Sequence, residues 1–471
     1  MDAERHLEIR APLDQLEAEV VRRDLAHPEE IGRPRVEALR YVLSFARSTV
    51  VRNRDGQDVE VAETLVPFAR RVRSTLEPLL AASQAGLWDA ARALPELVAA
   101  TRAARADLLD SMPLDRDSLE EEVTRRLFVV ACGGGGGSGF GYAGAWMLFY
   151  RHDLQPALIA GTSMGAIIGL FRARRRRFDM AAMVDAGRRI SWPRMFRLLE
   201  GGSRYGLPAS VRLALHPTLG ACFQDPSGRP YTLADLEIPM RIVVTGLRLG
   251  ALQHDLSYYE HFLDEVVREG FAITTGRLRR VANVVQLVRE LLRDPSLLRE
   301  VVFGADPVTR EADVLDAVGF SAAVPGIIHY DVVRDDPRMC DLLDRVFAEF
   351  DIVRLTEGGL VDNVPARVAW EAVMRGDLGR RNAFVLAMDC FAPRAMSLLF
   401  YPLQQAIRPM VLKSTRFAHL YFPLERVLSP VHLTPDLAAL QRCMGWTTRE
   451  LKPHLPFLKA MCATLPVLQD G

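Results

Sequence analysis

The sequence predicts an α/β fold with a mostly parallel sheet that helices cover on both faces. From residue 126 onward, short apolar runs rich in β-branched residues alternate with longer stretches of helical pattern, as in chains built from strand–helix–strand units. Helical patterns without such runs lie on both sides of this region. We therefore expect strands at residues 127–132, 157–160, 240–245, 326–332 and 383–388.

Residues 1–125 are the first expected segment, a helical N-terminal extension rich in Leu, Ala, Arg and Glu. Apolar residues recur there at three- and four-residue steps, which marks one buried face of a helix. These residues are Leu65, Phe68, Val72, Leu76 and Leu79. Pro67 and Pro78 are expected to interrupt or begin helices. The segment contains no group of residues typical of catalysis, so we expect a packing or partner-binding role.

Residues 126–394 are the expected α/β domain, and residues 395–471 are expected to form a helical C-terminal region. Within the domain, the stretch near 250–312 is charged and helical in pattern, so we expect it to be a helical insertion. A chain of 471 residues is long enough to bury a sizeable core in such a domain and still carry both extensions.

Charge and cysteine content exclude several classes of function. Lys+Arg and Asp+Glu both number 59, so no overall field attracts a nucleic acid. The cysteines form no C-x-x-C pair, and we expect free thiols, no metal and no cofactor. The first residues, MDAERHLEIR, lack the apolar stretch of a signal peptide, and no apolar run is long enough to span a membrane. We expect a cytoplasmic protein, with residues 398–402 (LLFYP) as the candidate for peripheral membrane contact.

A G-x-S-x-G sequence follows the strand expected at 157–160 and precedes an apolar helical stretch. A strand, a tight glycine turn and a helix together present a serine as a nucleophile, which here is Ser163. Gly161 and Gly165 lack a Cβ and so permit the turn and close packing of strand on helix. The alternative is that the serine only caps the helix.

Five consecutive glycines, residues 133–137, follow the first expected strand. Backbone N–H groups beside residues without a Cβ can approach the oxyanion that forms during acyl transfer. One alternative is a structural loop. Another is nucleotide binding, since residues 139–144 read G-x-G-x-x-G, but the acidic residue expected at the end of the next strand is missing. With the serine turn, the glycine run predicts acyl transfer, most simply ester hydrolysis.

A serine nucleophile needs a base that takes its proton. The downstream histidines lie in no distinctive motif, and His329, at the end of an apolar run, is the candidate among them. Glu357 is the stronger candidate, because Gly358 and Gly359 follow it and place its carboxylate on a tight loop.

Asp362 is the alternative acid on the same loop. Its position beside Asn363, before a helix, is also explained by helix capping. A site without a working base is the third alternative.

In this order, the motifs resemble those of the patatin-like phospholipases, which have a G-G-G-x-R-G loop, a G-x-S-x-G turn and a D-G-[GA] loop. Residues 240–245, 320–326 and 383–389 are similar to further segments of that family, and the resemblance covers residues 126–392. It implies a three-layer α/β domain of patatin type. It also implies hydrolysis of a lipid or other ester by a serine–acid dyad, without histidine and without a metal.

The resemblance implies a role for each site residue. The serine attacks the ester, Glu357 takes its proton, and the N–H groups of Gly135, Gly136 and Gly137 hold the oxyanion. Two positions depart from the family, because Ser138 stands where the family has arginine and Glu357 stands where it has aspartate. The extra methylene of glutamate displaces the carboxylate by about 1 Å unless the loop compensates. The alternative function is therefore a non-hydrolytic lipid-binding or scaffold protein on the same fold.

Overall fold

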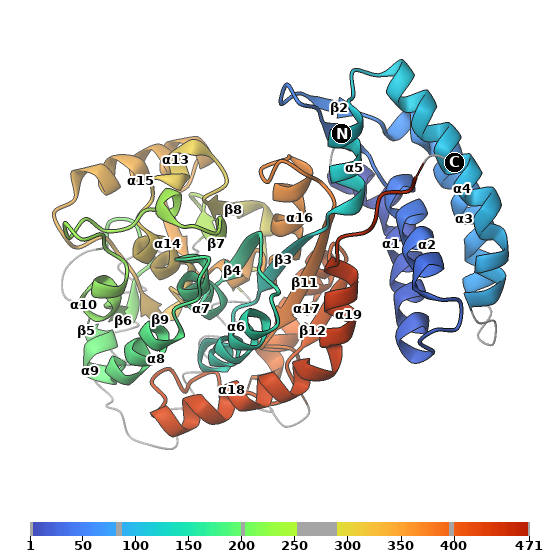
Figure 1. Ribbon diagram of the computed structural model, residues 1–471. Coiled ribbons are helices and arrows are strands. Elements are labelled where there is room, and N and C mark those ends of the chain that lie inside the picture. Colours follow the sequence, from blue (N-terminus) through green and yellow to red (C-terminus); the bar gives the residue numbers. More distant parts are fainter. Residues whose placement is uncertain (1–2, 82–86, 199–202, 252–289, 395–399, 470–471) are drawn as a thin grey trace. The chain divides into compact units, whose positions relative to one another are not determined.

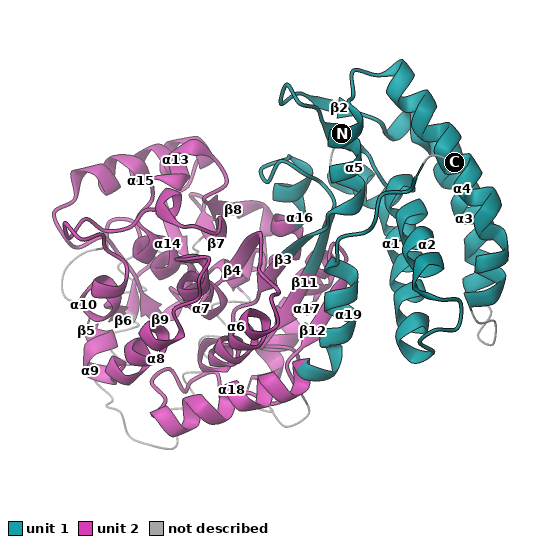
Figure 2. Cartoon of the chain, in the orientation of Figure 1, with its two compact units in different colours: residues 1–129, 370–385, 452–471 teal, residues 130–369, 386–451 magenta. Residues whose placement is uncertain are grey.

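The computed structural model describes residues 3–81, 87–198, 203–251, 290–394 and 400–469 (Figure 1). The chain forms two compact units, shown in different colours in Figure 2. Unit 1 comprises residues 1–129, 370–385 and 452–471, and unit 2 comprises residues 130–369 and 386–451. This division differs from the three consecutive segments expected from the sequence, because the chain returns to unit 1 twice after residue 369.

Unit 1 is helical, with one small antiparallel hairpin. Its core is a continuous cluster of buried leucine, valine and aromatic side chains. Its elements are α1 (Ala3–Ala26), α2 (Arg33–Ala46), β1 (Val50–Arg52), β2 (Asp58–Glu60), α3 (Ala62–Ala81), α4 (Leu87–Ser111), α5 (Arg116–Thr124) and α19 (Leu455–Cys462).

Helix α3 carries the periodic apolar face expected from the sequence, with one shift. Leu80 is buried at the end of this face, whereas Leu79 is only partly buried. Pro67 and Pro78 lie inside the helix, so the expectation that they interrupt it is wrong. Burial of the apolar face outweighs the backbone hydrogen bonds that the two prolines remove.

A seven-stranded sheet, most of which belongs to unit 2, has the strand order β10-β7-β4-β3-β11-β12, and β8 also pairs with β7 (Figure 1). Strands β4 and β7 are parallel, as are β11 and β12, whereas β8 and β10 are antiparallel to β7. Every residue of β7 and β11 is buried, as in sheets covered on both faces. The strands are β3 (Leu127–Cys132), β4 (Leu158–Thr162), β7 (Met240–Leu247), β8 (Leu298–Phe303), β10 (Arg354–Thr356), β11 (Ala383–Asp389) and β12 (Leu420–Pro423). The predicted α/β class, with a central and mostly parallel sheet, is confirmed.

Helices surround this sheet, and one of the predicted strands belongs elsewhere. The strand expected at 326–332 forms β9 (Gly326–His329), which pairs with β6 (Ala209–Leu213) in a separate sheet that also contains β5 (Phe196–Leu198). The helices are α6 (Tyr142–Arg151), α7 (Met164–Ala173), α8 (Met180–Arg189), α9 (Trp192–Met195), α10 (Leu215–Leu219), α13 (Pro307–Arg310), α14 (Val314–Ser321), α15 (Pro337–Phe350), α16 (Ala366–Met374), α17 (Tyr401–Thr415) and α18 (Leu437–Leu451).

Two strands lie where helices were expected. Strand β8 falls within the helical insertion expected near 250–312, of which residues 252–289 lie outside the described residues. Its charged residues are partly exposed and its first and last residues are buried, so the charges that suggested a helix belong to an edge strand. Strand β12 lies in the expected helical C-terminal region and is only four residues long, too short for its alternation to be recognised.

The expected membrane-contact segment lies partly outside the described residues, which resume at residue 400. Tyr401, at the start of α17, is 44% exposed. Across the parts of the chain that the structure describes, no helix has both the length and the apolar character needed to cross a membrane.

Candidate active site

Two strands of the central sheet end opposite each other along one edge of β7. Strand β4 is parallel to β7 and ends opposite Val243, whereas β10 is antiparallel to β7 and ends opposite Thr245. Both lie on the same edge of β7, because β8 occupies the other edge over this stretch. Ser163, which follows β4, and Glu357, which follows β10, therefore both come to the position beside Val244. The register of β7 thus brings together the nucleophile and the acid expected from the sequence.

Ser163 occupies a strained turn between β4 and α7. Its backbone angles are φ 53° and ψ −125°, a combination that non-glycine residues rarely adopt. Its side chain forms no capping hydrogen bond with α7, which argues against the capping alternative. A Cβ on Gly161 would lie 2.7 Å from Cα of Ala166, and one on Gly165 would lie 2.3 Å from the carbonyl oxygen of Cys132. Glycine is therefore required on both sides of the serine.

The Ser163 hydroxyl donates a hydrogen bond to Oε2 of Glu357 over 3.2 Å. The backbone N–H of Ser163 donates to the Ser321 hydroxyl over 2.8 Å, and that hydroxyl donates to the carbonyl oxygen of Val243 over 2.6 Å. Ser321 thus ties the strained turn to β7. Sequence reasoning quoted the segment around Ser321 but gave this residue no role, because only the fold shows which N–H group its hydroxyl meets.

The Glu357 carboxyl is held by neutral groups. Burial raises the pKa of Glu357 to about 8, although hydrogen bonds from the Ser163 hydroxyl and the Gly359 N–H act in the opposite direction. Its backbone N–H donates to the carbonyl oxygen of Ala323 over 3.0 Å, and its carbonyl oxygen accepts from the Thr245 hydroxyl over 2.7 Å. A fixed carboxyl that titrates near neutral pH can exchange a proton with the serine.

The glycine of the loop that lies against the serine is Gly134. A Cβ on Gly134 would lie 3.1 Å from Cβ of Ser163 and 3.4 Å from Oε1 of Glu357. The N–H groups of Gly133 and Gly134 are already used, since they donate to the carbonyl oxygens of Met388 and Asn363, each over 3.0 Å. The loop therefore lies beside the nucleophile, and its free N–H groups come later in the chain.

Gly135 and Gly136 are the loop residues whose N–H groups donate no hydrogen bond within the described residues. The N–H of Gly137 donates to the carbonyl oxygen of Pro430 over 2.8 Å. The expectation that Gly137 contributes to an oxyanion hole is therefore corrected, because a chain segment far away in the sequence uses its donor. Gly135 and Gly136 are the two candidates that remain.

The segment around Pro430 also explains why a serine, Ser138, occupies the position where the family has arginine. Ser138 is fully buried, and its hydroxyl donates to the carbonyl oxygen of Leu428 over 2.8 Å. A Cβ on Gly136 would lie 2.3 Å from the carbonyl oxygen of Pro430, and one on Gly137 would lie 2.4 Å from that of His432. This close packing leaves no space for a long side chain at residue 138.

Asp362, the alternative acid, contacts a different partner. Its Oδ2 accepts a hydrogen bond from the Ser414 hydroxyl over 2.8 Å, while its Oδ1 is buried and accepts none within the described residues. Burial raises the pKa of Asp362 well above its usual range. Helix α16 begins only at Ala366, so the capping explanation is also corrected. The structure brings Glu357, and not Asp362, to the serine.

Asn363 joins the acid loop to the glycine loop, a role that the sequence did not indicate. A Cβ on Gly134 or on Gly359 would lie 2.8 Å from Oδ1 of Asn363. A Cβ on Gly358 would lie 2.1 Å from the carbonyl oxygen of Val243. Both glycines of the acid loop are thus needed for the close approach of backbone and side chains.

The other candidates from the sequence lie elsewhere. His329 is buried in the small sheet, where its Nδ1 lies 3.0 Å from the carbonyl oxygen of Leu207. Two glycines of the G-x-G-x-x-G pattern, Gly141 and Gly144, pack against α18, and a Cβ on Gly144 would lie 2.2 Å from the carbonyl oxygen of Met444. That packing leaves no room for a phosphate between the glycine and the helix.

One cluster among the described residues has ligand atoms close enough to hold a cation. It consists of His216, Asp313 and Asp316. The guanidinium of Arg334 lies among them and donates to Asp313 over 2.8 Å and to both carboxylate oxygens of Asp316. The arginine already supplies the positive charge, so this cluster is an ion-pair network of the fold.

An apolar cavity of about 40 Å³ begins at the residue after the nucleophile. Met164 and Ile167 of α7 line it, with Met183 of α8 and with Leu440 and Met444 of α18. All of its lining residues are apolar or glycine. Flexible methionine side chains can move to admit an elongated apolar ligand.

A family model described as Patatin-like phospholipase matches residues 130–370, just over half of the 471-residue chain. The matched stretch contains the glycine loop, the Ser163 turn and the Glu357 loop. No curated protein matches the chain.

Proposed function

Because this chain belongs to the patatin-like phospholipase family, we propose that it is a serine lipid acyl hydrolase that uses Ser163 and Glu357 as its catalytic pair. The observation that carries the proposal is the 3.2 Å hydrogen bond from the Ser163 hydroxyl to Glu357, formed by a serine in a strained turn. A nucleophile in hydrogen-bond contact with a base is the arrangement that activates a serine hydroxyl.

In the first half of the reaction, ionised Glu357 accepts the hydroxyl proton while Oγ of Ser163 attacks the ester carbonyl. The carbonyl oxygen becomes an oxyanion and receives hydrogen bonds from the N–H groups of Gly135 and Gly136. When the tetrahedral intermediate collapses, Glu357 returns the proton to the departing alcohol oxygen. The acyl group then remains on Ser163 as an ester.

In the second half, Glu357 takes a proton from a water molecule, and the hydroxide oxygen attacks the acyl carbon. Collapse of this intermediate breaks the bond to Oγ of Ser163, which regains its proton from Glu357, and the carboxylic acid leaves. A carboxyl of ordinary pKa is a weak base at neutral pH. The pKa of about 8 therefore supports the role of Glu357, because a base works best when its pKa is near the working pH.

The apolar cavity beside Met164 supports an acyl chain as the group next to the reacting carbonyl. Every group that lines it is apolar, so it favours a hydrocarbon chain over a sugar or a peptide. Met164, which lines this cavity, directly follows Ser163 in the chain.

Labelling with a fluorophosphonate tests the nucleophile and the oxyanion donors together. The probe should modify wild type and the matched surface variant Ser227→Ala at Ser163, and it should leave Ser163→Ala unmodified. Peptide mapping locates the label, circular dichroism checks folding, and p-nitrophenyl esters of several chain lengths report hydrolysis. Labelling at another serine contradicts the assignment of the nucleophile. A folded wild type that is neither labelled nor active on any ester supports the non-hydrolytic lipid-binding alternative.

A further inference from the structure

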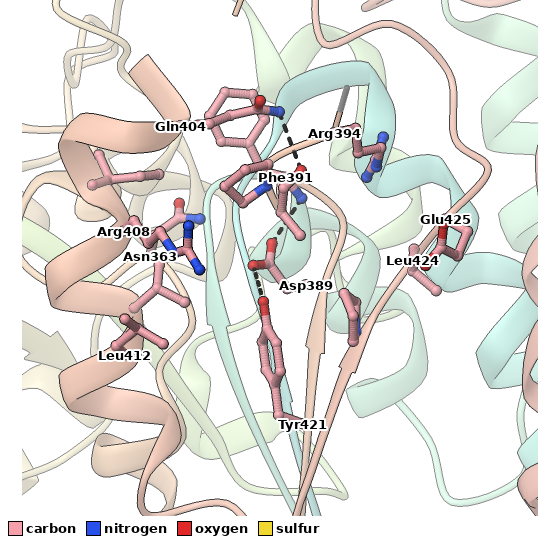
Figure 3. Close-up of a pocket in the computed structure, with 15 residues that line it drawn as sticks. Asn363, Asp389, Phe391, Arg394, Gln404, Arg408, Leu412, Tyr421, Leu424 and Glu425 are labelled. Carbon is pink, nitrogen blue, oxygen red and sulfur yellow. Dashed lines mark hydrogen bonds between the residues drawn. The ribbon is translucent and has the colours of Figure 1, made fainter. Parts of the chain in front are cut away.

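A cavity of about 250 Å³ lies beside the glycine loop, within unit 2 (Figure 3). Its walls come mainly from α17 and from the residues after β11 and β12, which lie outside the stretch matched by the family. Two of its lining residues also touch the glycine loop. Asn363 packs against Gly134, and a Cβ on Gly135 would lie 3.1 Å from Cβ of Phe391. The side chain of Phe391 thus lies between this cavity and Gly135, one of the two proposed oxyanion donors.

Two polar side chains of this cavity, Arg394 and Gln404, have buried hydrogen-bonding atoms without partners. The Nε of Arg394 is buried and donates no hydrogen bond, while another nitrogen of the same guanidinium donates to the carbonyl oxygen of Cys390 over 2.6 Å. Gln404 is 2% exposed; its Nε2 donates to the carbonyl oxygen of Ala392, but its buried Oε1 accepts nothing within the described residues. Arg408 also lines the cavity, but it is exposed, and it forms no ion pair or hydrogen bond with any described residue. Buried polar atoms are nearly always paired, so an unpaired donor on Arg394 and an unpaired acceptor on Gln404 in one cavity indicate a ligand that offers both complements.

The two acids that line the cavity form no direct ion pair with these arginines among the described residues. Asp389 accepts hydrogen bonds from the Phe391 N–H over 2.7 Å and from the Tyr421 hydroxyl over 2.8 Å, one on each carboxylate oxygen (Figure 3). Burial raises the pKa of Asp389, whereas the charge of Arg394 acts in the opposite direction. Glu425 is exposed and forms no ion pair among the described residues. Positive charge is therefore available to an anionic ligand.

We propose that this cavity binds the phosphate of a phospholipid head group, with Arg394 and Arg408 donating to phosphate oxygens and Gln404 accepting from a hydroxyl or ammonium hydrogen of the head group. Guanidinium groups match phosphate oxygens in charge and in geometry. The cavity is smaller than the ~300–1,000 Å³ that a whole drug-sized ligand occupies, so it suits the polar end of a larger molecule. The proposal rests on the proposed function, which places an acyl chain in the apolar cavity beside Met164.

The acceptor on Gln404 makes the assignment more specific. Glycerol and ethanolamine head groups carry O–H or N–H hydrogens that can reach Oε1, whereas the quaternary ammonium of choline carries none. The cavity therefore favours phosphatidylglycerol or phosphatidylethanolamine over phosphatidylcholine.

Hydrolysis of short-chain lipids that differ only in the head group tests the proposal. The substrates are monomeric dihexanoylphosphatidylglycerol, dihexanoylphosphatidylcholine and the neutral lipid dihexanoylglycerol. Arg394→Gln and Arg408→Gln should each lower the ratio of kcat/KM for the phosphatidylglycerol to kcat/KM for the neutral lipid by about tenfold or more. Arg426→Gln, which replaces an exposed arginine that does not line the cavity, should leave this ratio unchanged. An unchanged ratio in both cavity variants overturns the head-group site while leaving the hydrolase intact.

Binding measured by calorimetry separates failure of the site from failure of the hydrolase. Glycerophosphoglycerol should bind Ser163→Ala protein, and Arg408→Gln introduced into that protein should weaken binding by about tenfold or more. Such binding in a protein inactive on every ester supports the site and overturns the hydrolase. Inorganic phosphate that binds as tightly as glycerophosphoglycerol overturns the head-group assignment, and so does a cavity that binds neither.

Discussion

Two glutamates, a buried one in unit 1 and a partly buried one in unit 2, are held in opposite ways. In unit 1, Glu17 of α1 accepts hydrogen bonds from Arg40 over 3.0 Å, from Arg126 over 2.8 Å and from Arg47. Burial alone would raise the pKa of Glu17, but the three arginines lower it to about 2. In unit 2, Glu357 has only neutral partners, and burial raises its pKa to about 8.

The difference separates a structural charge from a reactive one. A carboxylate surrounded by arginines stays ionised across the physiological pH range, so it can stabilise a fold but cannot exchange a proton there. A carboxyl with neutral partners has its pKa close to neutrality and can accept and return a proton. Removal from water acts to raise the pKa of both carboxyls, and the presence or absence of a neighbouring cation decides which role each can perform.

Replacing each glutamate by glutamine should have opposite consequences. Glu357→Gln should lower kcat by about 10²–10⁴-fold, because an amide cannot accept the serine proton, and it should leave the fold intact. Glu17→Gln should lower the free energy of unfolding by about 3–5 kcal/mol, because it leaves buried arginines without their partner charge. Hydrolysis of p-nitrophenyl butyrate and urea unfolding followed by circular dichroism measure the two effects. Full activity of Glu357→Gln would remove the contrast on which the catalytic assignment depends.

Glu357→Asp is the matched control, since it keeps the charge and removes one methylene. The site holds glutamate at 3.2 Å from the serine hydroxyl, so we expect the shorter side chain to lower the rate by about a hundredfold. A sharp rise in activity would instead indicate that the natural site is an impaired hydrolase.

The pH dependence of the wild type should also follow Glu357. Because the ionised form accepts the proton, kcat/KM should rise about tenfold per pH unit and level off above a pH of about 8. The free energy of unfolding should change in the opposite direction and fall as the pH rises. Between the ordinary value of 4.5 and about 8, the unfolded chain has already released the proton that the folded chain retains, so folding is disfavoured as pH rises.

Unfolding of wild type and Glu357→Gln across this pH range tests the second part of the pH prediction. The wild type should lose stability relative to the variant by at most about 1.4 kcal/mol per pH unit. A rate profile that levels off near pH 5 would show that Glu357 keeps an ordinary pKa and that burial does not set it.

The sequence was sufficient for features that depend on local chemistry. Strands β3 and β11 could be predicted because they are uninterrupted apolar runs, and the turn at Ser163 because glycines flank it. The pairing of β10 with β7 could not, because a three-residue strand carries almost no pattern and its register depends on a partner about a hundred residues away. Which loop N–H groups remain free was also beyond the sequence, since Pro430 uses the N–H of Gly137 from nearly three hundred residues away.

The smallest expected effect concerns Asp362, which lies five residues after Glu357 and is buried. Burial raises its pKa well above its usual range, which favours the protonated form, and asparagine is a close substitute for that form. Asp362→Asn can keep the hydrogen bond from Ser414, and activity should change by less than about threefold. Unfolding should require as much free energy as in wild type, or up to about 2 kcal/mol more, with a larger gain at pH 7 than at pH 5, because the unfolded aspartate ionises above its ordinary pKa of 3.8. Steady-state kinetics and urea unfolding at both pH values measure this. If Asp362→Asn is inactive while Glu357→Gln is active, the roles of the two acids are reversed. The serine proton would then be accepted by Asp362, the carboxyl that Ser414 contacts.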